Sequence, residues 1–284
     1  MKHIVLCIIC IIFLCLTVLG SCSDRRPTTG RPCVVVSIEP LRFFTQSIAG
    51  DRMDVVSLVP EGISPEMYEP TPQQMMMLSD AKAFFKVGQL GFETTWLPKV
   101  SENVPDLPVV DTSEGLSSLD MRSSVFDPHT WTSPRLATSI CQTICDALCA
   151  IDTAGTAYYR LQLDSLTRRI ANVETQIHQL LKDQPYRTFV IAHPALTEFA
   201  ADFGLKQLSI EKDGKEPGVQ WMKTLVTQCR QDSVKTILVQ PEFNPAMACT
   251  LARETGAAIV TVNPLSYDWE NEMLHIAQAI KNGK

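Results

Sequence analysis

The chain lacks any excess of positive charge. Its 284 residues carry 25 lysines and arginines against 31 aspartates and glutamates, which gives a formal net charge of −6 at pH 7. Without a basic cluster, the sequence does not favour a nucleic acid or another polyanion as a partner. Histidine is scarce, with five residues, and the motif His-Glu-x-x-His, which holds zinc in many hydrolases, does not occur.

The sequence also lacks an apolar run long enough for a comfortable membrane span. The longest run covers residues 4–19 and ends in Leu19-Gly20-Ser21-Cys22. This ending resembles a bacterial lipobox, which implies cleavage before Cys22 and a lipid on its sulfur. An ordinary signal peptide or an uncleaved anchor is the alternative. We therefore expect a lipoprotein signal peptide over residues 1–22 and a protein anchored to a membrane on the periplasmic, extracytoplasmic side.

Residues 23–31 offer no side chain for a hydrophobic core and are expected to form a flexible tether. Apolar residues make up 45% of the chain and charged residues 20%, which is ample for a buried core beyond the tether. The globular part is therefore expected to begin at about residue 32.

The cysteines show no disulfide or metal-binding pattern. Cys141, Cys145 and Cys149 recur every fourth residue beside an apolar stripe, which places them on one face of a helix. Side chains on adjacent helical turns point in parallel, and that is a poor geometry for a disulfide. We expect these thiols to pack in the core rather than to bind a metal.

Short apolar runs alternate with helical patterns along the globular part. Strands that alternate with helices favour parallel sheets built from βα units. In the first half, we expect strands over residues 34–38, 55–59, 83–87 and 108–110, a long turn after residue 59, and helices from 41, near 92 and over 134–150. In the second half, we expect strands over 188–192, 207–210, 236–239 and 258–262, and helices near 195, 220 and 246 and over 269–280.

The most regular segment, residues 156–183, predicts one long helix with a single apolar face. A coiled-coil dimer is the alternative, but the pattern is short and lies between two βα regions. A rigid spacer between two lobes of a monomer fits better, and His178 falls off its apolar stripe. The predicted fold is α/β with two lobes, over 32–153 and 185–284, each with a parallel sheet flanked by helices, joined by one long rigid helix over 154–184.

Two histidines are expected in loops at the edges of these elements. His129 follows Asp127-Pro128, a dipeptide that fixes a turn, and precedes a helix with Ser133 as its N-cap. His193 directly follows an apolar strand, and ligands bind at the carboxyl ends of parallel strands in open α/β folds. Glu66 and Asn263 lie in comparable loops.

Five ordered motifs resemble those of the metal-binding receptors of bacterial ABC importers for zinc and manganese. The resemblance covers the chain from about residue 33 to its end, and it implies two α/β lobes, a divalent metal cargo and an ABC permease as partner. The motifs are Pro65-Glu66-Met67-Tyr68-Glu69-Pro70, Asp127 through Trp131, His193 with Phe203-Gly204-Leu205, Glu216-Pro217-Gly218, and Asn263-Pro264-Leu265.

Two departures from the family pattern fall on metal-ligand positions. Glu66 stands where the family has histidine, and Asn263 where it has aspartate, so the acid has moved to the other lobe. A glutamate oxygen can bind zinc, whereas the amide of Asn263 is a weak neutral donor. Glu242 or a water molecule is the alternative fourth ligand. The resemblance thus implies a metal site drawn from Glu66, His129, His193, Asn263 and Glu242.

Zinc is the expected metal, because His193 resembles the zinc-type members, and manganese or iron is the alternative. A cation bound by residues of both lobes would hold the lobes together. The protein with its bound ion would then present one shape to the permease. We expect no enzyme, although a two-histidine, one-carboxylate set also occurs in oxygenases and hydrolases. A further alternative is a lipoprotein on the same scaffold whose altered site holds no transition metal.

Overall fold

The computed structural model describes residues 30–116, 127–212 and 217–283. The expected signal peptide, Cys22, most of the tether and Glu216 lie outside the described residues. The described residues from Arg31 onward belong to one compact unit. Of the helices described, none combines the length and the apolar character needed to cross a membrane.

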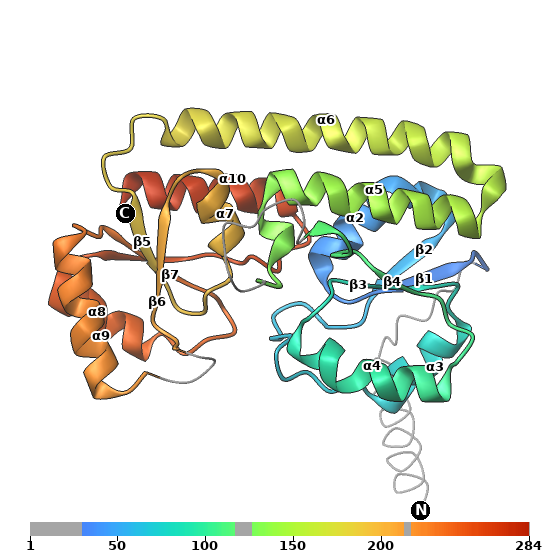
Figure 1. The fold of residues 1–284 in the computed structure, drawn as a ribbon, viewed down its shortest axis with the longest axis horizontal. Coiled ribbons are helices and arrows are strands. Elements are labelled where there is room, and N and C mark those ends of the chain that lie inside the picture. The colour runs from blue at the N-terminus through green and yellow to red at the C-terminus, as the bar shows by residue number, and fades with distance from the viewer. Residues whose placement is uncertain (1–29, 117–126, 213–216, 284) are drawn as a thin grey trace, which may run out of the picture. The chain divides into compact units, whose positions relative to one another are not determined.

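The first lobe is built on a four-stranded parallel sheet in the order β2-β1-β3-β4. Its strands are β1 (Cys33–Val36), β2 (Asp54–Ser57), β3 (Phe84–Lys86) and β4 (Val109–Asp111). β1 is buried along its whole length, as expected for a strand of a parallel sheet covered on both faces. In Figure 1, helices α2 (Glu39–Ala49) and α5 (Pro134–Ile151) lie on one side of this sheet and α3 (Pro72–Asp80) and α4 (Gly91–Asn103) on the other.

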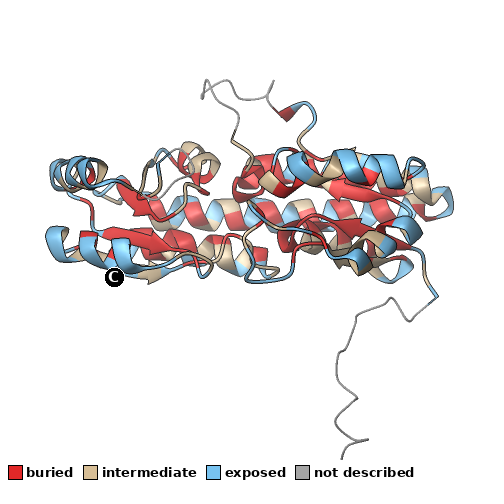
Figure 2. Cartoon of the chain, turned by 90° about the horizontal axis from the view of Figure 1, so that it is seen from below, coloured by how far each residue is buried: buried red, intermediate tan, exposed pale blue. Residues whose placement is uncertain are grey.

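The second lobe repeats this topology with the strand order β6-β5-β7-β8. Its strands are β5 (Thr188–Ile191), β6 (Lys206–Ser209), β7 (Thr236–Val239) and β8 (Ala258–Thr261). Its helices are α7 (Thr197–Asp202), α8 (Val219–Gln231), α9 (Ala246–Thr255) and α10 (Trp269–Asn282). Figure 2 shows the central strands of both sheets buried, with exposed residues on the outer faces of the helices. The predicted fold class is confirmed.

One helix, α6 (Thr156–Leu181), runs past both lobes (Figure 1). It packs against α5 and α2 of the first lobe and α10 of the second. Its predicted apolar face is buried in these contacts, which leaves that face unavailable for a coiled-coil partner. His178 is exposed, as predicted, and its ring lies against that of Phe203 at 4.8 Å.

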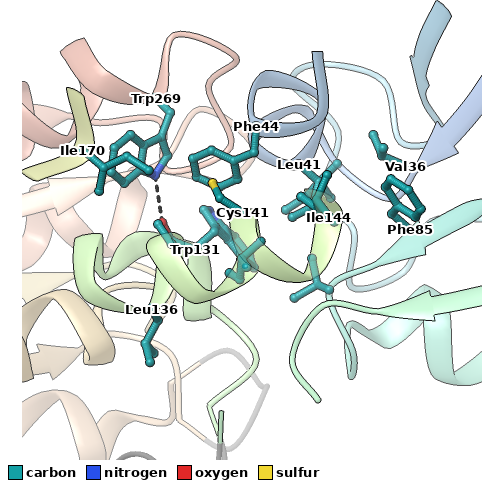
Figure 3. Packing of buried hydrophobic residues seen from close by; sticks show 14 of the residues in the cluster. Val36, Leu41, Phe44, Phe85, Trp131, Leu136, Cys141, Ile144, Ile170 and Trp269 are labelled. Carbon is teal, nitrogen blue, oxygen red and sulfur yellow. Dashed lines mark hydrogen bonds between the residues drawn. The ribbon is translucent and has the colours of Figure 1, made fainter. Parts of the chain in front are cut away.

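A pair of tryptophans ties the two lobes together in the core (Figure 3). Trp269 donates its indole N–H to the backbone oxygen of Trp131 at 2.8 Å, and Trp131 donates its own to the backbone oxygen of Pro264 at 2.8 Å. Both side chains are almost completely buried. Because each donor is satisfied inside the core, the pair fixes the first lobe against the start of α10 without the cost of an unpaired buried N–H.

The cysteines of α5 pack in the core, as the helical spacing predicted. Cys141 and Cys145 are buried and Cys149 is half-buried, and the cysteines in the described part of the chain are free thiols. Burial raises the pKa of the Cys145 thiol to about 12, with a smaller contribution from Cys149. Such thiols are unreactive and act as small hydrophobic side chains.

The sequence interpretation missed α3, which lies within the expected long turn. Thr71 accepts a hydrogen bond from the Gln74 N–H, and the Gln74 side chain accepts one from the Thr71 N–H, with Pro72 at the first helical position. This capping box is a recognisable start signal. The apolar periodicity that normally identifies a helix is weak, because Leu78 is the one fully buried residue among those of α3.

Candidate metal centre

His129 is held from behind by the carboxylate of Asp127. One oxygen of Asp127 accepts the His129 backbone N–H at 2.9 Å and lies 2.7 Å from the ring Nδ1. Burial opposes ionisation of Asp127, but its hydrogen bond and charge contact with His129 hold the pKa of this carboxyl below its usual range. An ionised Asp127 keeps the proton on Nδ1, so the Nε2 atom is left to face outward as a ligand.

His193 is held in the same way from the second lobe. Its Nδ1 lies 2.7 Å from a carboxylate oxygen of Glu211, which follows β6. The buried amide of Gln240 clamps its backbone, because it accepts the His193 N–H at 3.2 Å and donates to the His193 carbonyl at 2.7 Å. The ring of Phe243 stacks on the imidazole at 5.0 Å and 7°. The ring is thus held at Nδ1 by Glu211 and on one face by Phe243, and its backbone is held by Gln240.

The two imidazoles meet at their Nε2 atoms, which are 3.2 Å apart. Two nitrogens that bind one zinc ion at 2.0–2.1 Å in tetrahedral geometry lie about 3.3 Å apart, so this separation fits a shared ion. Burial, followed by the charge of His129, lowers the pKa of His193, while Glu211 and Glu66 partly offset this. A lowered pKa favours the neutral imidazole, the form that binds metals.

Glu66 completes a three-residue group at this point. One carboxylate oxygen of Glu66 and one nitrogen from each of His129 and His193 lie within 4.8 Å of one another. All three line a cavity of about 20 Å³, which is room for a single ion or water molecule. The structure therefore brings together a carboxylate and an imidazole from the first lobe and an imidazole from the second.

The two remaining candidates are placed differently. Glu242 lines the same cavity, and its buried Oε2 finds no hydrogen-bond partner among the described residues. Burial raises the pKa of Glu242. The described residues that line the cavity do not include Asn263, although Pro264 and Leu265 line it. The Asn263 amide oxygen instead accepts the Leu265 N–H at 3.2 Å, within its own turn.

Sequence reasoning did not identify the residues that support the imidazoles. Asp127 was considered as a turn residue and as the first residue of a motif, but not as the partner of the His129 ring, and Glu211, Gln240 and Phe243 were not assigned to His193. A signal existed for Glu211, since it follows β6 at the carboxyl edge where His193 follows β5. The roles of Gln240 and Phe243 depend on how the loop after β7 turns, which no local pattern encodes.

The chain has two parallel-sheet lobes spanned by one long helix, and a histidine from each lobe faces a shared small cavity. This combination is typical of a solute-binding receptor that carries metal ions. The family described as the periplasmic component A of the zinc-uptake complex, ZnuA, matches residues 34–283. The chain belongs to this family. Its members serve as metal-binding receptors for ABC importers of zinc or manganese and are not enzymes.

Similar proteins carry different metals. The zinc-binding lipoprotein AdcA of Streptococcus pneumoniae is 26% identical over 270 residues, which cover 89% of this chain and 54% of AdcA, so the chain spans about half of that relative. The manganese-binding lipoprotein MntA of Halalkalibacterium halodurans is 28% identical over 231 residues, 80% of this chain and 76% of MntA. A crystal structure of ZnuA matches with a TM-score of 0.84 and 32% identity over 89% of this chain and 98% of that one.

Proposed function

We propose that this chain binds one zinc ion through Glu66, His129 and His193 in the cavity between its lobes and delivers it to an ABC permease. The observation that carries the proposal is the 3.2 Å separation of the two Nε2 atoms. Both rings have a carboxylate behind Nδ1, an arrangement that orients metal-binding histidines and raises their basicity. A bound ion would join a ligand pair from the first lobe to a ligand from the second.

Glu242 is the proposed fourth ligand, in preference to Asn263 or water. Glu242 lines the cavity but stands outside the group of ligand atoms that lie within 4.8 Å of one another, so it would have to move toward the ion. Its buried Oε2 atom lacks a partner among the described residues, and a buried carboxylate without a partner is costly. A cation would remove that cost. The amide oxygen of Asn263 is already used within its turn.

The small cavity favours zinc over manganese or iron. Zinc accepts four ligands in a tetrahedral arrangement, whereas manganese prefers more oxygen ligands in an octahedral one. A cavity of about 20 Å³ leaves little room for added water ligands. Some relatives are named for zinc and others for manganese, so the small size of the cavity is the observation that favours zinc here.

Anchoring by a lipid on Cys22 is the second part of the proposal, supported by the lipobox-like sequence and by relatives named as lipoproteins. The test is labelling of expressing cells with a radioactive fatty acid. The wild-type chain should carry label and sediment with membranes, and Cys22→Ala should lose the label. Equal labelling of both chains would contradict lipidation at this residue.

Isothermal titration tests the metal site. The mature lipoprotein is stripped of metal, kept in mild detergent because of the lipid proposed on Cys22, and titrated with zinc and then with manganese. We expect one zinc ion per chain, weaker manganese binding, and loss of tight binding in Glu66→Ala and His193→Ala. The matched control is His178→Ala, which removes an exposed histidine outside the site and should bind as wild type.

Absence of binding by either metal would contradict the proposal and favour the alternative of a lipoprotein with a degenerate site. Tight binding that survives in both Glu66→Ala and His193→Ala would place the ion elsewhere on the chain. Binding lost in His193→Ala but retained in Glu66→Ala would remove Glu66 from the ligand set.

A further inference from the structure

A glycine at the start of α4 lies directly against the backbone of Glu66. A Cβ atom on Gly91 would be 2.1 Å from the carbonyl oxygen of Glu66, 2.9 Å from its carbonyl carbon and 3.0 Å from its Cα. These separations are far below van der Waals contact, which for such atoms is about 3.5 Å. The obstructing atoms are backbone, so they cannot swing aside as the end of a flexible side chain could.

The close approach to Glu66 accounts for a glycine at residue 91, whereas its backbone conformation does not require one. Its backbone does not adopt the positive φ that favours glycine, in contrast to Gly62, which has φ +78° in the turn before Glu66. Within a helix, alanine is favoured over glycine. Helix propensity alone therefore predicts that alanine at residue 91 would be tolerated or stabilising.

The start of α4 is held in place and cannot retreat from the loop. The buried carboxylate of Glu93 accepts the backbone N–H groups of Val87 and Gly88 at 2.8 Å and of Leu90 at 3.3 Å, and it accepts the hydroxyl of Ser37. These bonds anchor the first turn of α4 to the carboxyl ends of β1 and β3. The Phe92 N–H in turn donates to the backbone oxygen of Pro65 at 3.1 Å, which ties the loop to that turn.

We propose that Gly91 is a positioning residue for Glu66, setting how closely the Glu66 carboxylate approaches His129 and His193 and thereby the affinity of the site. The inference rests on the proposed function, in which Glu66 is a ligand. A side chain at residue 91 would push the Glu66 backbone away by about 1 Å or more. A displacement of that size is large compared with the tolerance of a metal–ligand distance, about 0.2 Å.

The test is zinc titration of the metal-stripped mature lipoprotein carrying Gly91→Ala. We expect the dissociation constant to rise about 10–100-fold, the range found when groups that orient metal ligands are changed. Gly218→Ala is the matched control, because Gly218 also lies at the start of a helix and a Cβ there would meet no atom of the described residues within 4 Å. Unchanged affinity in Gly91→Ala, with tight binding in the wild type, would overturn the inference and leave the proposed function standing.

A double-mutant cycle with Glu66→Ala separates positioning from general damage. If Gly91 acts through Glu66, Gly91→Ala should cause no further loss of affinity once Glu66 is absent. An equal loss in both backgrounds would overturn the inference.

If Gly91→Ala fails to reach the wild-type circular dichroism spectrum, Glu93→Gln takes its place, because it loosens the anchor of α4 without adding bulk. It should lower zinc affinity only when Glu66 is present. Absence of zinc binding by the wild type would instead refute the proposed function.

Discussion

At the scale of single residues, each imidazole of the site has its own carboxylate. Asp127 lies behind His129 and Glu211 behind His193, each 2.7 Å from Nδ1. Both pairs are largely buried, so the orientation of each ring depends on its carboxylate rather than on solvent. The two lobes thus present matching carboxylate–histidine units to one cavity.

The first prediction concerns the unit in the first lobe. In Asp127→Asn the amide can donate to Nδ1, which favours the wrong tautomer and directs a proton to Nε2. Zinc affinity should fall about 10–100-fold, measured by competition with a chromophoric chelator. Asp146→Asn, which changes an exposed aspartate on α5, is the control and should bind as wild type. Equal affinities for the two variants would contradict this account of Asp127.

The second prediction concerns the pH dependence that Glu242 confers on the metal-free protein. Burial raises the pKa of Glu242 in the folded state, whereas the unfolded chain releases this proton near pH 4.3. Above that pH the folded state binds more protons than the unfolded state, so this group lowers stability as pH rises. Glu242→Gln should therefore melt at a higher temperature than wild type at pH 7, with a smaller difference near pH 4.

The zinc affinity of Glu242→Gln should fall in the same protein, since an amide is a weaker ligand than a carboxylate. Glu254→Gln, an exposed site, is the control for both measurements. A metal-free Glu242→Gln protein that melts below wild type at pH 7 would show that the carboxylate is not a cost to the fold.

At the scale of elements, periodicity decided what could be predicted from the sequence. The strands and α6 were predicted well, because buried parallel strands form short apolar runs and α6 repeats its apolar residues every three or four positions. α3 was missed because only its capping box, and no buried stripe, marks it.

At the site, His129 and His193 stood out by position, but the supporting roles of Glu211 and Gln240 depend on contacts between loops that are distant in the sequence.

The third prediction tests whether the buried face of α6 holds the lobes. Leu166 is 1% exposed and Leu161, on the same helix, is 62% exposed. Leu166→Ala should lower the free energy of unfolding by about 2–5 kcal/mol, because it removes buried methyl groups and leaves a cavity. Leu161→Ala should change it by less than about 0.5 kcal/mol. Urea denaturation followed by circular dichroism measures both, and similar losses would contradict the assigned face.

At the scale of the whole molecule, the site connects parts of the chain that fold on separate sheets. Trp131 and Trp269 already join the lobes through hydrogen bonds in the core. A metal ion held by His129 and His193 would add a second connection at the cavity. The ion would then bind the folded arrangement of both lobes and not either lobe alone.

The fourth prediction follows from that difference in binding. Zinc at a hundred times its dissociation constant should stabilise the folded protein by about 2.7 kcal/mol, provided that it does not bind the unfolded chain. Differential scanning calorimetry should show the melting temperature rising with zinc concentration. His129→Ala should abolish the rise, and the exposed His178→Ala should retain it. A rise of equal size in His129→Ala would show that the stabilising ion binds elsewhere.

The positions of the proposed ligands along the chain determine how late in synthesis and folding the site can form. Glu66 precedes β3, His193 follows β5, and Glu242 follows β7, so the proposed ligand set is complete only after more than four-fifths of the chain has been made and both sheets have closed. Contacts this distant in sequence are slow to form, because closing a long loop costs conformational entropy. A chain that crosses a membrane unfolded would therefore carry no ion across with it, and it could acquire its cargo only in the compartment where it folds.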